Sequence, residues 1–163
     1  MTSRELHALG EPSLVLGELK LWVHGRQFPN ADDYWDGNWL SVTAHYHRHQ
    51  SSVVADGPFL HLGELWGLYQ GCLRMHASLK GEAALECIEP NLSLKLTAGP
   101  TGRIQVETTI TPDQSTESHS YINEIDLSYL PAINAALASI FNEYPIKEPS
   151  ELPARRRLTP RSS

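Results

Sequence analysis

The sequence lacks most of the features that identify common classes of enzyme and membrane protein. Its 163 residues include two cysteines, Cys72 and Cys87, which are too few and too far apart for a disulfide framework or a CxxC zinc site. No apolar run approaches the roughly 20 residues that a membrane helix needs. The first residues show no secretory signal. These absences predict a cytoplasmic protein with no membrane span and two reduced thiols.

Catalytic motifs are missing as well. The chain has no glycine-rich nucleotide-binding motif, no GxSxG nucleophile motif and no HExxH metal motif. Neither cysteine is paired with a histidine at a known catalytic spacing. The sequence therefore predicts neither an enzyme nor a bound cofactor.

Positive charge is scarce, and its distribution is uneven. Residues 1–145 hold eight Lys and Arg against seventeen Asp and Glu, a net charge of -9. Residues 146–163 carry a net charge of +3 and include the run Arg155–Arg157. The negative field of the larger part repels phosphate backbones and speeds encounter with a basic partner. This charge argues against a nucleic-acid ligand and favours a basic protein partner.

Two kinds of spacing organise the chain. Apolar and polar residues alternate, as in strands, near 19–24, 40–47, 51–61, 81–89, 91–98, 102–111 and 117–126. Helical spacing replaces this alternation at about 62–79 and 128–144. Because the connections between strands are short, we predict an α+β fold, a mainly antiparallel sheet or flattened sandwich of six to seven strands with two helices. Residues 14–145 would form this single domain, after a loose arm at 1–13 and before a disordered tail at 146–163.

Both predicted helices have distinctive residues. In 62–79, Gly63, Gly67 and Gly71 recur every fourth residue, which favours a neighbouring backbone packed close to the helix. An outward-facing stripe would instead suggest a homodimer, which we do not predict. For 128–144, Ser128 is the expected N-cap. An apolar stripe defines the buried face of this second helix, formed by Leu130, Ile133, Leu137, Ile140, Phe141 and Tyr144.

The segment 24–40, between the first two predicted strands, is the most unusual part of the chain. It combines four aromatic residues and three aspartates with two glycines and a proline. A loop with so much apolar surface is usually packed on itself or functional. Its acidic part offers a candidate binding site for a protein partner, formed by Asp32, Asp33, Tyr34, Trp35 and Asp36. Turn formation by the aspartates and support by the aromatics are the structural alternatives.

A second candidate is the histidine set His45, His47 and His49. At a spacing of two residues, a strand would place all three imidazoles on one face, where they can bind zinc or copper if a further ligand arrives. The same face is the polar side of an amphipathic strand, so the simpler interpretation is a solvated strand end without metal.

Two parts of the loop carry a family resemblance. Gly25, Gln27, Phe28 and Pro29 form the first part, and the second runs from Asp36 through Gly37, Asn38 and Trp39 to Leu40. With them, the sequence resembles the WapI family of bacterial immunity proteins over about 19–145. The resemblance implies a cytoplasmic protein that binds and neutralises a polymorphic toxin, of nuclease type in the named family, and it carries no catalytic residues.

Three functions remain open from the sequence. The favoured one is an immunity protein whose acidic loop docks on a basic toxin domain. The second is an interaction domain without a toxin partner, and the third is a metal-binding protein or enzyme that uses the histidine set.

Overall fold

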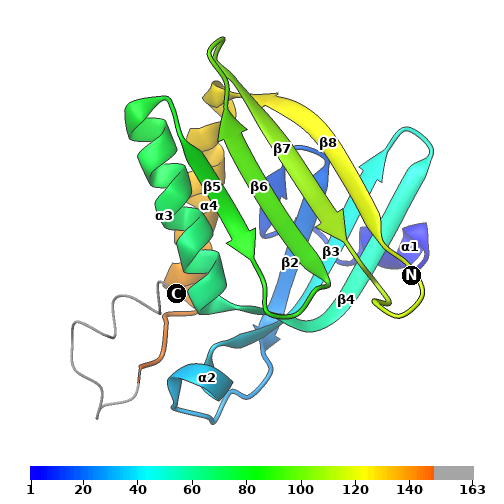
Figure 1. Ribbon diagram of the computed structural model, residues 1–163. Helices are drawn as coiled ribbons and strands as arrows, with labels where there is room; N and C mark the ends of the chain where they lie inside the picture. Colours follow the sequence, from blue (N-terminus) through cyan, green and yellow to red (C-terminus); the bar gives the residue numbers. More distant parts are fainter. Residues whose placement is uncertain (149–163) are drawn as a thin grey trace.

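The structure is a computed structural model that describes residues 1–148 (Figure 1). Two four-stranded antiparallel sheets and four α-helices make up the described residues, which confirms the α+β prediction. The first sheet has the order β1 (Leu14–Leu16), β2 (Leu19–Arg26), β3 (Trp39–Arg48) and β4 (Ser51–His61). The second has the order β5 (Glu82–Glu86), β6 (Leu92–Ala98), β7 (Arg103–Ile110) and β8 (His119–Asp126).

The eighth strand, β1, is absent from the sequence-based prediction. It is three residues long, with Leu14 and Leu16 buried around the exposed Val15, which is too short to show a period in the sequence. Before it, the predicted arm contains the short helix α1 (Ser3–Ala8), which Thr2 and Glu5 cap reciprocally. The arm is tied down where the Trp22 indole donates to the carbonyl of Gly10. The division of the chain at residues 13 and 145 stays a prediction, and residues 149–163 of the predicted tail lie outside the described residues.

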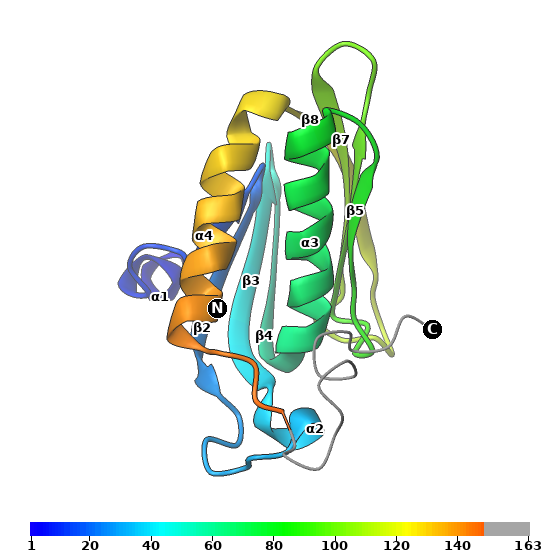
Figure 2. The same ribbon diagram turned by 90° about the vertical axis from the view of Figure 1, so that its left-hand side faces the viewer.

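The two long helices close one side of the molecule. Helix α3 (Leu62–Ser78) lies beside β5, and α4 (Leu130–Glu143) lies next to α3 and β1 (Figure 2). The N-terminus of the last helix differs from the prediction. A 3-10 turn, η1 (Leu127–Tyr129), precedes α4, and the carboxylate of Asp126 caps that turn by accepting the N–H of Ser128, so Ser128 is not the cap. None of the helices in residues 1–148 is long and apolar enough to cross a membrane.

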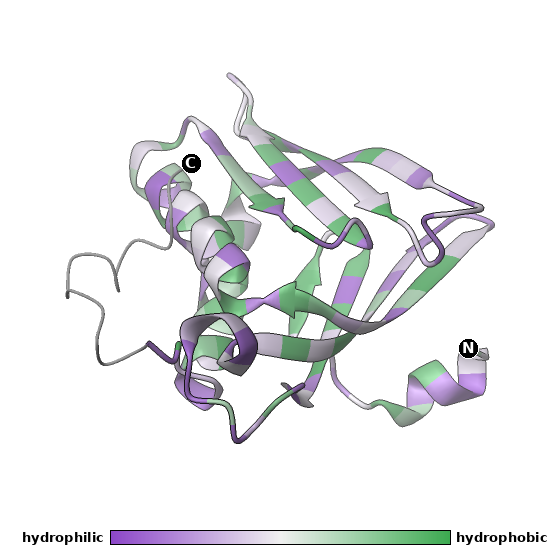
Figure 3. Cartoon of the chain, turned by 60° about the horizontal axis from the view of Figure 1, so that its bottom comes forward, coloured by the Kyte–Doolittle hydropathy of each residue, from purple (hydrophilic) through white to green (hydrophobic). Residues whose placement is uncertain are grey.

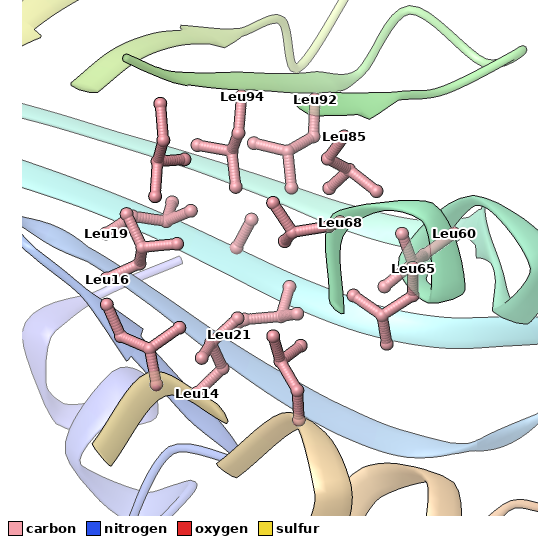
Figure 4. Close-up of a cluster of buried hydrophobic side chains, with 14 of the residues drawn as sticks. Leu14, Leu16, Leu19, Leu21, Leu60, Leu65, Leu68, Leu85, Leu92 and Leu94 are labelled. Carbon is pink, nitrogen blue, oxygen red and sulfur yellow. The ribbon is translucent and has the colours of Figure 1, made fainter. Parts of the chain in front are cut away.

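The core lies between the inner faces of the two sheets and the buried faces of α3 and α4. Hydrophilic and apolar residues alternate along the strands (Figure 3), so each sheet turns one apolar face inward. Leucines from both sheets and α3 meet there (Figure 4), among them Leu14, Leu16, Leu19, Leu21, Leu60, Leu65, Leu68, Leu85, Leu92 and Leu94. The first four residues of the predicted α4 stripe, Leu130, Ile133, Leu137 and Ile140, are buried as well.

The glycines of α3 explain how this helix approaches the second sheet. A Cβ atom at Gly71 would lie 2.7 Å from the Cβ of Ala83 on β5, so only glycine allows this approach. At Gly67 a Cβ atom would meet nothing within 4 Å. The predicted close packing is therefore confirmed at Gly71, and the helix and strand separate towards Gly67.

Candidate functional site

The loop between β2 and β3 folds into a compact unit at one end of the molecule (Figure 1). A glycine-dependent irregularity opens it: Gly25 has φ 153°, and the pairing of β2 with β3 shifts its register between Val23 and Gly25. One turn of helix, α2 (Tyr34–Gly37), fills the loop, and the carboxylate of Asp33 caps it by accepting the N–H of Asp36 at 2.9 Å. The Gln27 N–H then donates to the carbonyl of Trp39 at 2.9 Å, which closes the base of the loop.

The loop is fastened by the segment that follows α4. The fully buried Asn38 donates from Nδ2 to the carbonyls of Tyr34 and Lys147, both at 2.7 Å, and its Oδ1 accepts the N–H of Lys147 at 2.8 Å. The Lys147 ammonium donates to the carbonyls of Pro29 at 2.7 Å and Ala31 at 2.8 Å. The loop therefore has one conformation held by a distant part of the chain.

Arg26 adds a third attachment at the base of the loop. Its guanidinium donates to the carbonyl of Gly37 at 2.7 Å and to the carbonyl of Pro145. It also lies 6.0 Å from the centre of the Tyr144 ring. Partial burial lowers the pKa of Arg26, although this group stays charged at any ordinary pH.

Behind α2, an aromatic cluster surrounds His61. The rings of Tyr34, Trp35 and Trp39 lie 5.1, 5.7 and 5.0 Å from its imidazole, between ring centres, and His61 is 2% exposed. Because Nδ1 accepts the N–H of Gly63 at 3.0 Å, the proton sits on Nε2, which donates to the carbonyl of Tyr34 at 3.1 Å. This neutral tautomer fits the burial, which lowers the pKa of His61. The cluster buttresses the inner side of α2.

The structure brings the predicted partner-binding residues together on α2 and the residues just before it. Asp32, Asp33 and Asp36 are exposed, and Trp35 is 47% exposed. Tyr34 is half-buried with its hydroxyl against Gly63, and burial raises the pKa of Tyr34 to about 12. Asp33 has a structural role as a cap, whereas the carboxylates of Asp32 and Asp36 remain on the surface.

All residues of the loop motif except Phe28 have a structural role. Gly25 forms the irregularity, Gln27 and Trp39 close the base, Pro29 and Gly37 supply carbonyls to Lys147 and Arg26, and Asn38 is the buried tie. Phe28 is 45% exposed beside the candidate site.

The histidine set does not share one face. His45 and His47 lie on β3 with ring centres 6.0 Å apart, but His49 follows the strand in the β3–β4 turn, at φ 55°. The prediction of three imidazoles on one strand face is wrong because the strand ends at Arg48. His45 contacts the hydroxyl of Ser52 at 2.8 Å. Within residues 1–148, no three His, Cys, Asp or Glu side chains are grouped to hold a metal ion.

The structure adds a groove that sequence reasoning missed. It has a volume of about 740 Å³, runs from Tyr34 and Trp35 between α3 and β5, and includes Glu64, Glu82 and Glu86. Glu64 accepts the N–H of His61 at 3.0 Å from one oxygen and that of Ile88 at 2.6 Å from the other. Burial raises the pKa of Glu64. The sequence signal for the position of Glu64 is the capping box that it forms with His61 at the start of α3. This signal is hard to recognise because histidine replaces the usual Ser or Thr cap.

Comparison with known families decides the classification. The model of the immunity protein WapI-like family matches residues 15–145. The chain belongs to this family. The match confirms the resemblance carried by the loop motif, and the site described above lies almost wholly within the WapI-like region. The attachment through Lys147 lies two residues beyond it.

Other comparisons add little. No curated protein matches the chain. A chain in crystal structures of Trypanosoma bruciei MRP1/MRP2 aligns with a TM-score of 0.38 and 10% identity, over 86% of this chain and 91% of that chain.

Proposed function

We propose that this chain is an immunity protein that neutralises a cognate bacterial toxin by binding it directly in the cytoplasm. Membership of the WapI-like immunity family carries the proposal. A non-enzymatic role is consistent with that family. The net charge of -9 on residues 1–145 supports a basic partner such as a nuclease-type toxin domain, because opposite charge accelerates encounter.

We place the centre of the contact on α2. Trp35 offers a large aromatic surface on a turn whose backbone is already fixed by Asn38, Arg26 and His61. A rigid aromatic anchor binds at a lower entropic cost than a mobile loop does. Asp32 and Asp36 flank it with exposed carboxylates.

Co-expression in a sensitive host tests the neutralisation. The chain is expressed together with the C-terminal domain of any large secreted protein that is encoded next to its gene, and survival is scored. We expect rescue that depends on this chain and a complex that survives gel filtration. Death of the host despite good expression of the folded chain would refute the proposal.

Variants of α2 test the placement of the contact. Trp35→Ala should weaken toxin binding by about 2 kcal/mol, roughly thirtyfold, through faster dissociation. The double variant Asp32→Lys, Asp36→Lys should slow association and reduce its dependence on salt. A matched control reverses two exposed carboxylates elsewhere, Glu11→Lys and Glu18→Lys. Equal association rates for the two charge variants would remove α2 from the interface.

A further inference from the structure

The groove between α3 and β5 has a wall that is also a sheet edge. Among residues 1–148, β5 pairs with β6 alone, and its other side faces α3 (Figure 2). Contact is close at one end, where Gly71 meets Ala83, and open at Gly67. The middle of the strand therefore borders empty space, not a packed helix.

The pairing register shows which backbone groups face this space. The carbonyl of Gly81 accepts the N–H of Ala98, so the odd-numbered residues of β5 bond to β6. The backbone N–H and C=O groups of the even-numbered residues therefore point away from β6. Two contacts agree with this phase, since the Glu82 carbonyl points at Gly71 and the N–H of Ile88 donates to Glu64.

Ala84 and Glu86 lie between these two contacts. By the same alternation, each directs one N–H and one C=O into the groove. Within residues 1–148, no loop or side-chain hydrogen bond reaches these four groups. An edge with unpaired donors and acceptors is a template for another strand.

The charge of the groove selects the chemistry of that strand. Three carboxylates, of Glu64, Glu82 and Glu86, line it with one cation, Arg74. Glu82 also pairs with Lys95 at 3.9 Å and both Glu64 oxygens accept backbone N–H groups, so Glu86 is the carboxylate best placed for a basic side chain. Ile88, which is 68% exposed, and Trp35 supply apolar surface at the end near α2. An extended segment with basic side chains satisfies both the edge and the carboxylates.

We propose that this groove binds an extended segment of a protein partner that carries lysine or arginine, and that the segment adds to β5 through Ala84 and Glu86. That the partner is the toxin rests on the proposed function, whereas the chemistry of the groove does not. The groove would then extend the contact made by α2, because Tyr34 and Trp35 border both.

A peptide titration tests the groove without the toxin. The isotope-labelled full chain is titrated with an octapeptide of alternating lysine and threonine, and then with its glutamate–threonine counterpart. We expect the lysine peptide to shift the amide resonances of Ala84 and Glu86 and to slow their hydrogen exchange. No change at these amides, or an equal change with the glutamate peptide, would overturn the proposal.

Two pairs of variants separate binding from folding. Gly67→Phe fills the groove at a position where a Cβ meets nothing within 4 Å, and Gly67→Ala is its control. Ala84→Pro deletes an outward N–H without removing a bond to β6, and Ala84→Ser is its control. Where the Gly67→Phe and Ala84→Pro proteins fold, each should bind the lysine peptide roughly tenfold more weakly than its control. Unchanged binding in both would refute the pairing.

The toxin domain and the chain's own basic residues complete the test. If the chain rescues the host, but the Gly67→Phe protein rescues it equally and binds the toxin equally well, the toxin does not occupy the groove. The proposed groove contact is then refuted, and the proposed neutralisation stands. Peptide binding without rescue refutes the proposed function alone. A last variant replaces Arg155, Arg156 and Arg157 by alanine and is measured without peptide. If the amide resonances of Ala84 and Glu86 shift, the occupant of the groove is the chain itself, and the proposal of a separate protein partner is refuted.

Discussion

Replacing Asn38 by alanine should destabilise the protein by about 3 kcal/mol. The side chain makes three short hydrogen bonds, to the carbonyls of Tyr34 and Lys147 and from the N–H of Lys147. Each contributes about 1 kcal/mol net, and more where the orphaned partner stays out of reach of water. Since Asn38 is fully buried, little water enters to replace the lost amide. At roughly 2–4 °C per kcal/mol, the melting temperature should fall by about 6–12 °C.

Urea unfolding followed by tryptophan fluorescence measures this change, because Trp35 and Trp39 adjoin the site. Asn142→Ala is the control, an exposed asparagine on α4 whose replacement should change stability by at most a few tenths of a kcal/mol. Asn38→Asp sharpens the test. It keeps the acceptor for the N–H of Lys147 and for the Arg26 guanidinium, which lies 3.4 Å from Oδ1, but places the other carboxylate oxygen against two carbonyls, so it should still destabilise the protein.

Two results would refute this reasoning. A loss below about 1 kcal/mol for Asn38→Ala would mean that the loop does not depend on the tie to Lys147. An Asn38→Asp protein as stable as the wild type would mean that the amide does not donate to the two carbonyls.

Three further predictions concern α3 and its surroundings. Gly71→Ala should destabilise the protein by about 1–3 kcal/mol because its Cβ would meet Ala83, whereas Gly67→Ala should stabilise it by up to about 1 kcal/mol through helix propensity. Urea unfolding of both variants measures the contrast, and a change of the same sign in the two free energies of unfolding would contradict it. Burial lowers the pKa of His61, so below about pH 6.5 the unfolded chain binds more protons than the folded one and the free energy of unfolding falls as the pH is lowered. His61→Asn should make the free energy of unfolding depend less on pH between pH 7.5 and 5. Burial raises the pKa of the Cys72 thiol to about 11, so its reaction with a disulfide reagent at neutral pH should be slow until urea opens the fold, and rapid native labelling would contradict this.

The repeating parts of the fold were predictable from the sequence. In strands such as β7 every second residue is buried and those between are exposed or partly exposed, and α4 presents Leu130, Ile133, Leu137 and Ile140 at helical spacing. Hydrophobic periodicity predicts such elements because the burial of each residue follows from its position along the strand or helix. β1 was not predicted because its three residues are too few to show an alternating pattern. The prediction of Ser128 as the helix N-cap was wrong because Asp126 caps a 3-10 turn that precedes α4.

The candidate site was predictable only in composition. Its aspartates and Trp35 are adjacent in sequence, so the loop could be recognised as a unit. Arg26, one of the groups that fix it, lies within the same segment, but His61 and Lys147 come from distant parts of the chain, and no local pattern records such contacts. The groove is a further step away, because its edge depends on the pairing phase of β5 and its width on where α3 leaves the strand.

The same contacts suggest why an immunity protein would keep so long a loop. A short hairpin between β2 and β3 would leave the end of the molecule without an aromatic anchor, while an unattached long loop would pay a large ordering cost on binding. Attachment through Asn38 and Lys147 removes that cost before the partner arrives. It also makes a clear distinction between variants. Asn38→Ala should weaken toxin binding with Trp35 still present, chiefly by slowing productive association. Trp35→Ala removes one ring of the cluster around His61 but keeps the ties of Asn38 to Lys147, so its main effect should be faster dissociation.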